Sequence, residues 1–280
     1  MSLREFKDAT VVVLGHGSTK NTDSAAAVYL QAAALRALGV FGEVQEGFWK
    51  QDPMAGEVLA EVLNPRVFIL PLFISEGYFT DDVIPRALKF RPGEAELSRV
   101  QRRGAQTWYY CRPIGTHERM TGVLLSRARE VVRRHPFPRA PREKDITLFI
   151  AGHGTPQNDQ SRAAIDVQVE RVRSMDLYAS VQPVFIEEPP LVSECYALAP
   201  TRNFVVVPFF ISDGMHVQED LPRLLGEPAE LVKKRLAAGV PAWHNPTERN
   251  GKLAWCSAAV GTAPELTAVM LERIREAATL

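Results

Sequence analysis

Two kinds of hydrophobic pattern alternate along this chain. Short runs that are almost wholly apolar, such as residues 11–14 and 203–209, are typical of strands buried on both faces of a parallel sheet. Between these runs, apolar residues recur every three or four positions, which predicts amphipathic helices. A regular alternation of such strands and helices is typical of the α/β class, in which helices cover both faces of a mainly parallel sheet.

The pattern predicts four strands in each half of the chain, with helices between and after them. In the first half the expected strands are residues 11–14, 43–49, 67–72 and 106–111, and the expected helices are residues 23–38, 54–63, 80–89 and 118–134. In the second half the expected strands are residues 146–151, 180–186, 203–209 and 253–257, and the expected helices are residues 159–174, 190–198, 217–225, 229–238 and 264–277. Each half is therefore expected to be a four-stranded parallel sheet flanked by helices.

The two halves also repeat each other in sequence. Gly-His-Gly occurs at residues 15–17 and again at 152–154, and Pro-Leu-Phe-Ile-Ser at 71–75 matches Pro-Phe-Phe-Ile-Ser at 208–212. Repeats in the same order and at a constant offset indicate a duplicated unit. We expect two similar domains, residues 1–136 and 145–280, joined by a linker rich in proline and charge. An extra segment between Gly226 and Lys252 has no counterpart in the first half.

Composition and charge exclude several classes of protein. With 46% hydrophobic residues the 280-residue chain can bury two cores, and 33 Lys and Arg against 33 Asp and Glu leave no basic surface for nucleic acid. The apolar runs are far shorter than the roughly 20 residues that cross a bilayer. The three separated cysteines are expected to be reduced packing residues. We expect a cytoplasmic protein that binds neither nucleic acid nor membrane.

Candidate metal-binding chemistry gathers where the strands of the second half end. His153 follows the first strand, Glu187 and Glu188 follow the second, and His216 lies in the loop after the third. Because the carboxyl ends of neighbouring parallel strands form the usual ligand site, these side chains are expected to converge. Two imidazoles and a carboxylate suit a divalent transition-metal ion. The sequence therefore predicts a metal site in the second half, with either glutamate as the acid.

The first half lacks most of this set. His16 matches His153, but Phe79 replaces His216 and Lys50 replaces Glu187. A phenyl ring cannot bind the ion and an ammonium group repels it, so the first half is expected to contact substrate. The residues expected to bind substrate are His16, Ser18, Thr155 and Ser212.

Three motifs occur in order: the paired Gly-His-Gly strand ends, Phe-Ile-Glu at 185–187, and Pro-x-Phe-Ile-Ser-x-Gly-x-His at 208–216 with acidic-Leu-Pro downstream. Together they resemble the sirohydrochlorin chelatase family, the small cobalto- and ferrochelatases of cobalamin and siroheme synthesis. The resemblance covers nearly the whole chain as two fused repeats. It implies an ATP-independent lyase that inserts Co²⁺ or Fe²⁺, as the substrate metal, into a tetrapyrrole held between two similar domains, with no permanently bound cofactor. The family's metal-binding histidines correspond to His153 and His216, and its acidic residue to Glu187, or to Glu188 if the alignment shifts by one.

Other functions agree less well with the sequence. A histidine phosphatase needs Arg-His-Gly, a serine hydrolase needs a Gly-x-Ser-x-Gly elbow, and a nucleotide-dependent enzyme of the P-loop type needs its glycine-rich loop; the chain has none of these motifs. A non-catalytic tetrapyrrole or metal carrier remains the alternative. Arg162 and Arg223 are candidate partners for substrate carboxylates. His117, His135 and His244 are expected to be surface residues.

Overall fold

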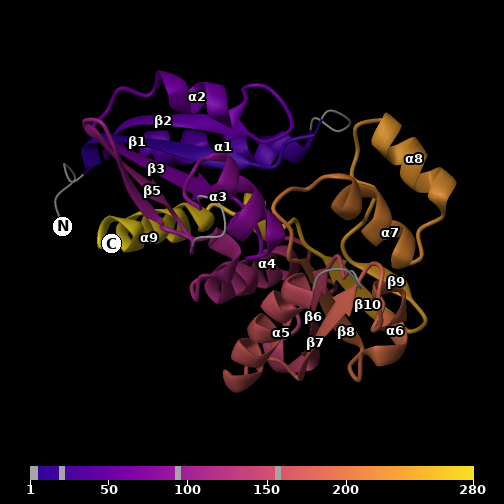
Figure 1. The fold of residues 1–280 in the computed structure, drawn as a ribbon. Helices are drawn as coiled ribbons and strands as arrows, with labels where there is room; N and C mark the ends of the chain where they lie inside the picture. Colours follow the sequence, from indigo (N-terminus) through magenta and orange to yellow (C-terminus); the bar gives the residue numbers. More distant parts are fainter. Residues whose placement is uncertain (1–5, 19–22, 92–95, 155–158) are drawn as a thin grey trace. The chain divides into compact units, whose positions relative to one another are not determined.

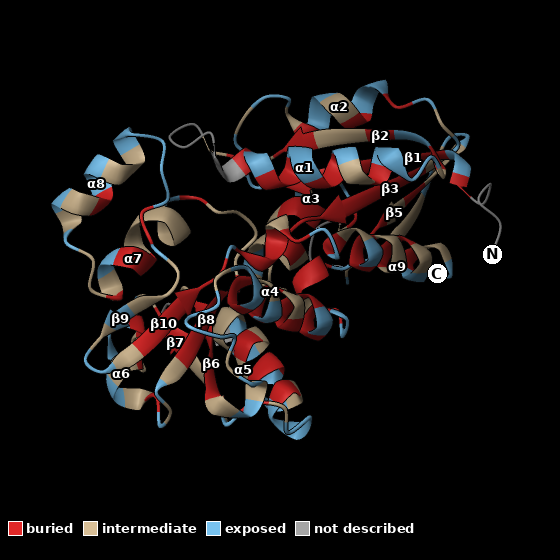
Figure 2. Cartoon of the chain, turned by 180° about the vertical axis from the view of Figure 1, so that it is seen from behind, coloured by how far each residue is buried: buried red, intermediate tan, exposed pale blue. Residues whose placement is uncertain are grey.

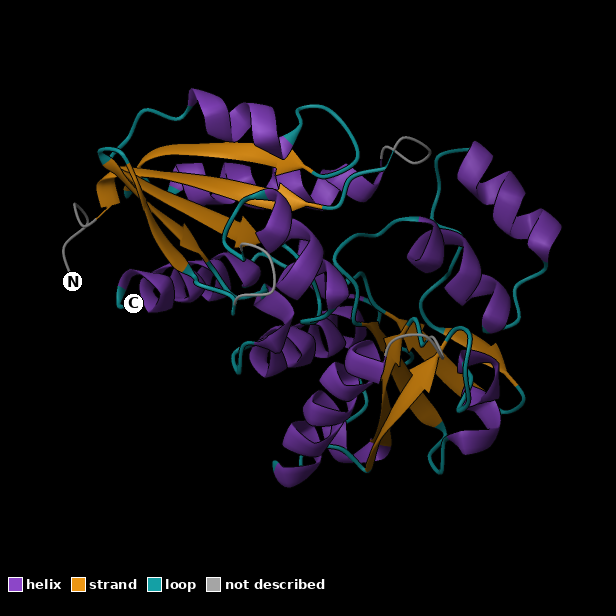
Figure 3. Cartoon of the chain, in the orientation of Figure 1, coloured by secondary structure: helices purple, strands orange, loops and turns teal. Residues whose placement is uncertain are grey.

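The computed structural model describes residues 6–18, 23–91, 96–154 and 159–280 and divides the chain into two compact units (Figure 1). Unit 1 consists of Met1–Glu118 and Pro264–Leu280, and unit 2 of Arg119–Ala263. Each unit has one five-stranded sheet with helices on both faces (Figure 3). The prediction of two similar α/β domains is confirmed.

Unit 1 has the strand order β2-β1-β3-β5-β4, in which only β4 is antiparallel to its neighbour. Its strands are β1 (Phe6–Gly15), β2 (Phe41–Phe48), β3 (Arg66–Pro71), β4 (Val100–Arg103) and β5 (Gln106–Tyr110). Its helical segments are α1 (Asp23–Ala37), α2 (Ala55–Glu61), η1 (Phe79–Val83), α3 (Ile84–Ala87), η2 (Ile114–Thr116) and α9 (Leu266–Ala278).

Unit 2 repeats this plan with the order β7-β6-β8-β10-β9. Its strands are β6 (Ile146–Gly152), β7 (Ser180–Phe185), β8 (Asn203–Pro208), β9 (Thr247–Arg249) and β10 (Lys252–Cys256). Its helical segments are α4 (Met120–Arg134), η3 (Glu143–Asp145), α5 (Asp159–Ser174), η4 (Val192–Glu194), α6 (Cys195–Leu198), η5 (His216–Asp220), α7 (Leu221–Leu224), α8 (Ala229–Ala237) and η6 (Val260–Thr262).

The central strands are apolar throughout because helices cover both faces of each sheet. Every residue of β6 is buried, and β8 is buried from Phe204 to Pro208 (Figure 2). In unit 2, α4 and α5 pack on one face, while α6 and α7 contribute Cys195 and Leu221 to the core on the other. All three cysteines of the chain are buried and free, as predicted. No helix among the described residues has both the length and the apolar character needed to cross a membrane.

The prediction of four strands per sheet missed the antiparallel edge strands β4 and β9. Both are short and polar, so they lack the apolar run that marks a buried strand. The turn between β9 and β10 holds Asn250 and Gly251 with φ of 51° and 73°. An Asn-Gly pair is a standard hairpin signal, so the sequence contained the clue to β9. The extra segment of the second repeat therefore forms α8 and this edge hairpin.

The compact units do not follow the two sequence repeats at their last helices. α4, which ends the first repeat, packs on β8 and β10 of unit 2, and α9, which ends the second, packs on β3 and β5 of unit 1. Arg127 of α4 donates to the carbonyl of Ala259 (3.1 Å), and Arg273 of α9 donates to the carbonyl of Pro113 (3.0 Å). Each unit thus takes its last helix from the other repeat, whereas the expected boundaries, 1–136 and 145–280, keep each helix with its own repeat.

Candidate metal site

A glycine turn at the end of a buried strand positions the first candidate histidine. Gly154 follows His153 with φ +65°, a left-handed conformation that favours glycine, and a Cβ there would overlap the side chain of Glu188. The carbonyl oxygen of His153 accepts a hydrogen bond from the backbone N–H of Glu187 (3.0 Å). The turn is therefore tied to the end of β7, and His153 lies at the carboxyl edge of the sheet.

The second candidate histidine opens the π-helical segment η5. His216 Nδ1 lies 2.7 Å from Oδ2 of Asp220 at the end of the same segment. Because a carboxylate only accepts hydrogen bonds, Nδ1 carries the proton and Nε2 keeps the electron pair that binds a metal ion. Nδ1 of His153 likewise lies 3.2 Å from the carbonyl oxygen of Gly154. Both imidazoles therefore have Nδ1 occupied within the protein.

The two imidazoles lie close enough to bind one ion. The ring centroids of His153 and His216 are 4.8 Å apart, with the ring planes at 86°. Two imidazoles bound about 2.0–2.1 Å from one ion have centroids roughly 4.5–5.2 Å apart when the angle at the metal is about 90–110°. Among the described residues, no group of three or more His, Cys, Asp or Glu side chains already stands in a metal-binding arrangement.

The structure distinguishes the two candidate glutamates. Glu187 Oε2 lies 3.7 Å from His153 Nδ1, and the Glu187 side chain is 52% exposed. The Glu188 side chain is only 17% exposed and lies 3.3 Å from Arg162 Nη1. Glu187 therefore lies beside His153, on the Nδ1 side of its ring, whereas Glu188 packs beneath the Gly-His-Gly turn.

The matching edge of unit 1 is aromatic and cationic. The rings of His16 and Phe79 have centroids 5.0 Å apart, and the Lys50 ammonium lies 5.8 Å from the Phe79 ring centre. Trp49 meets Phe79 edge-on at 6.1 Å. Val83 stands where unit 2 has Asp220, so this edge also lacks the carboxylate that orients the second histidine. Of the second-half donors, only the histidine of the glycine turn is present.

The remaining predicted residues have varied positions. The backbone N–H of Ser18 donates to the side-chain oxygen of Gln51 (2.8 Å). Ser212 is partly buried in the loop after β8, and Thr155 lies outside the described residues. Arg162 lies over the Phe185 ring, 4.7 Å from its centre, and already pairs with Glu188.

The three histidines expected at the surface differ in their exposure. His117 is buried, with 6% exposure, and its Nε2 lies 3.4 Å from Oε1 of Glu276, so the prediction for this residue is wrong. Its position after the Gly-Thr of η2, where the chain enters the next helix, explains the burial. His135 is partly buried, and His244 is exposed as predicted. Arg223, the other candidate partner for substrate, is exposed and pairs with Glu219 (3.3 Å).

Sequence reasoning missed Asp220 as part of the site. Its signal was the spacing of four residues from His216, which places the two side chains on one side of a helical segment. The spacing alone was ambiguous, because Glu219, three residues after His216, also lies on that side of a helical segment. The π-helical geometry of η5 decides which carboxylate meets the ring.

Comparison with known proteins establishes the family. The CbiX family model matches residues 10–131 and again residues 147–277. This chain belongs to the CbiX family. A CbiX-like relative from Halobacterium salinarum, named probable sirohydrochlorin cobaltochelatase, is 37% identical over 282 residues, which cover 95% of this chain and 91% of that protein. The sirohydrochlorin cobaltochelatase of Methanopyrus kandleri is 25% identical over 140 residues, 47% of this chain and 96% of that protein.

Solved structures share the CbiX architecture. A multi-domain protein of Deinococcus radiodurans with structural similarity to chelatases has a TM-score of 0.73 and 27% identity; the match covers 95% of this chain and 54% of that protein, so this chain spans about half its length. SirB from Bacillus subtilis with Fe³⁺ has a TM-score of 0.64 and 18% identity, with 96% of this chain and 95% of SirB covered. The likeness to SirB shows the fold alone.

Proposed function

We propose that this protein inserts a divalent metal ion, Co²⁺ or Fe²⁺, into sirohydrochlorin without consuming a nucleotide, as a lyase of cobalamin or siroheme biosynthesis. The observation that carries the proposal is the close approach of the His153 and His216 rings at one sheet edge, with Glu187 beside His153. The 37% identity to a probable sirohydrochlorin cobaltochelatase supports the same substrate.

The chemistry of insertion matches this donor set. The macrocycle binds M²⁺ and releases two N–H protons, so the site must hold an ion, give it up and accept protons. His153 and His216 each present a neutral nitrogen to the ion, and Glu187 balances part of its charge. Because Glu187 is half exposed, it takes one released proton and passes it to water, while the second proton leaves directly to solvent.

The matching edge of unit 1 carries groups of a kind that suits a tetrapyrrole. Phe79 and Trp49 offer aromatic faces to a flat macrocycle, and Lys50 offers a cation to its carboxylates. His16, Ser18, Thr155 and Ser212 remain proposed substrate contacts, because in the sequence all of them follow closely on the apolar runs of strands.

Purified protein mixed with sirohydrochlorin and Co²⁺ or Fe²⁺ tests the proposal. We expect insertion, followed by the change in the absorption spectrum of the macrocycle, to be faster than without protein and to continue for many turnovers per chain. Stoichiometric binding of the tetrapyrrole without acceleration contradicts the proposal and indicates a carrier.

Histidine variants locate the reaction. His153→Ala and His216→Ala are each expected to lower kcat/KM by about 100-fold or more, because each removes a metal ligand. His16→Ala is the matched control from the other repeat and is expected to have a smaller effect. An equal loss in all three variants contradicts the assignment of the metal to the second repeat.

A further inference from the structure

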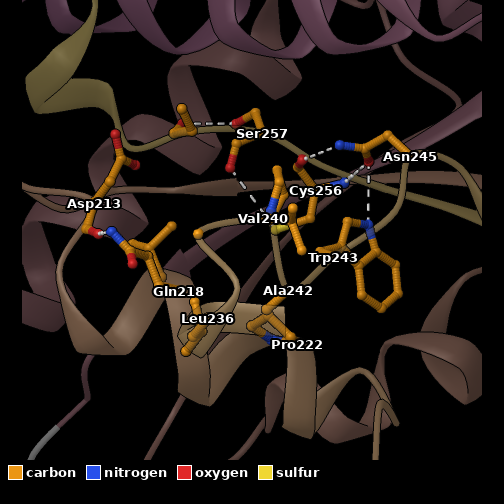
Figure 4. Close-up of a pocket in the computed structure, with 14 residues that line it drawn as sticks. Asp213, Gln218, Pro222, Leu236, Val240, Ala242, Trp243, Asn245, Cys256 and Ser257 are labelled. Carbon is orange, nitrogen blue, oxygen red and sulfur yellow. Dashed lines mark hydrogen bonds between the residues drawn. The ribbon is translucent and has the colours of Figure 1, made fainter. Parts of the chain in front are cut away.

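A pocket of about 480 Å³ opens in unit 2 beyond the carboxyl ends of β8 and β10 (Figure 4). This volume lies within the roughly 300–1,000 Å³ typical of small-molecule sites. Among the described residues that line it, none is His153, His216 or Glu187, although Val217 and Gln218 of the lining directly follow His216. Its lining comes from Val217 and Gln218 of η5, from Cys256 and Ser257 at the end of β10, and from residues 236–245 of the extra segment.

Comparison of the two repeats shows how the pocket arises. Tyr110 and Cys256 occupy the same position, because the residue after each donates its backbone N–H to the neighbouring parallel strand, at Ile69 in one repeat and at Val206 in the other. In unit 1 the Tyr110 ring is fully buried, and its hydroxyl donates to the carbonyl oxygen of Thr80 in η1 (2.8 Å). The much shorter Cys256 side chain leaves the corresponding space in unit 2 open.

The outer wall of the pocket is tied to the unit by side-chain bonds. Arg235 of α8 donates to the carbonyl oxygen of Ala242 (2.6 Å) and to the carboxylate of Glu227 (2.8 Å). Asn245 accepts a hydrogen bond from the backbone N–H of Cys256 (2.8 Å) and donates to the carbonyl oxygen of the same residue (2.9 Å). The segment that the second repeat alone possesses is thus held in place as a wall.

The charges around the pocket restrict what it can bind. No Lys, Arg or His is among the described lining residues, and Asp213 is the one carboxylate among them. Both Asp213 oxygens are already occupied, one by the backbone N–H of Ala259 (2.6 Å) and one by the hydroxyl of Thr262 (2.7 Å). Burial and the nearby Asp213 raise the pKa of the Cys256 thiol to about 12, so this side chain is neutral. An anion would therefore meet a negative charge and no cation.

We propose that this pocket binds an uncharged small molecule with an apolar, ring-sized body, at a site separate from that of the tetrapyrrole. Leu236, Val240 and Trp243 provide apolar contact, while Gln218 and Ser257 provide limited hydrogen bonding. The carboxylates of sirohydrochlorin are unsuited to this lining. A carboxylate buried without a cation loses its hydration, and no ion pair offsets that cost in free energy.

Occupation of the pocket bears on the metal site through η5. This five-residue segment carries His216 and its partner Asp220, while Val217 and Gln218, between them in sequence, line the pocket. A ligand that contacts Val217 therefore binds one residue away from His216 on the same segment. If a pocket ligand changes the affinity for the metal ion through this segment, linkage requires that the ion change the affinity for the pocket ligand by the same factor.

Fluorescence of a neutral probe, N-phenylnaphthylamine, tests the proposal on the full chain. We expect one probe to bind per chain, with the emission rise typical of an apolar site, and its sulfonated analogue to bind at least about tenfold more weakly. Cys256→Tyr, which places in unit 2 the side chain that unit 1 already holds, is expected to weaken the neutral probe by at least about tenfold. Val167→Tyr, on the exposed side of α5, is the control and leaves binding unchanged.

A second variant keeps the test decisive if Cys256→Tyr does not fold. Val240 lies at the rim with 46% exposure. Val240→Lys is expected to raise the affinity for the sulfonated probe several-fold and to leave the affinity for the neutral probe nearly unchanged. Equal binding of the neutral probe to wild type and Cys256→Tyr, or no effect of Val240→Lys on the sulfonated probe, overturns the proposal. Displacement of the neutral probe by saturating sirohydrochlorin also overturns it, because the pocket would then belong to the tetrapyrrole site.

Discussion

At the scale of single residues, one carboxylate separates the two repeats most sharply. Asp220 holds Nδ1 of His216, whereas the first repeat has Val83 at that position and Phe79 in place of the histidine. A carboxylate that binds the remote nitrogen of a metal-binding imidazole fixes its tautomer and raises its basicity. Asp220 thus belongs to the candidate metal site as a positioning residue, even though it need not touch the ion.

The variant Asp220→Asn tests this role. The amide can donate to Nδ1, which moves the ring proton to Nε2 and blocks the nitrogen that faces the ion. We expect the Co²⁺ affinity to fall by about 10–100-fold, measured by calorimetric titration without tetrapyrrole. Glu219→Gln, which removes an exposed ion pair with Arg223, is the control. An equal change of affinity in the two variants would show that Asp220 acts only through the general charge of the segment.

At the scale of elements, the segments η1 and η5 show what each repeat has kept. Both are five-residue π-helical segments that follow the third parallel strand and lead into a short helix with proline near its start. The backbone is therefore shared, and the chemistry differs only in its side chains. The aromatic edge of unit 1 thus shares its backbone with the candidate metal-binding edge of unit 2.

Grafting single residues between these elements gives a prediction. Phe79→His alone is expected to create no second metal site, because the Lys50 ammonium remains beside it and Val83 leaves the new ring unoriented. The triple variant Phe79→His, Lys50→Glu and Val83→Asp is expected to bind a second Co²⁺. Equilibrium dialysis that finds two equivalents in the single variant would contradict this account.

At the scale of the whole molecule, the sequence predicted the elements whose motifs recur in both repeats. It did not predict which unit each repeat's last helix packs on. The central strands and the proximity of His153 and His216 followed from apolar runs and strand ends. The polar strand β9 lacked an apolar run, and the partner of His216 depended on π-helical geometry. The exchange of α4 and α9 had no sequence signal. Both helices carry an arginine at the equivalent position, and each arginine contacts the threonine of an equivalent Gly-Thr turn, so either helix fits either unit.

These equivalent arginine–threonine contacts make the exchange of the two helices testable in the intact chain. Arg127 donates to the hydroxyl of Thr262 (2.8 Å) in unit 2, and Arg273 donates to that of Thr116 (2.9 Å) in unit 1. If α4 stayed with its own repeat, Arg127 would instead meet Thr116. A double-mutant cycle separates the two arrangements, because only side chains in contact share an interaction energy.

In the exchanged arrangement, Arg127→Ala and Thr262→Val are expected to be coupled by roughly 0.5–3 kcal/mol in the free energy of unfolding, measured from denaturant curves. Arg127→Ala and Thr116→Val are the matched control, with additive effects. Thr262 also donates to Asp213, but that contact is lost equally with and without Arg127 and so cancels within the cycle. Coupling of Arg127 to Thr116 in place of Thr262 would show that each helix packs on its own repeat. The two units would then coincide with the two halves of the sequence.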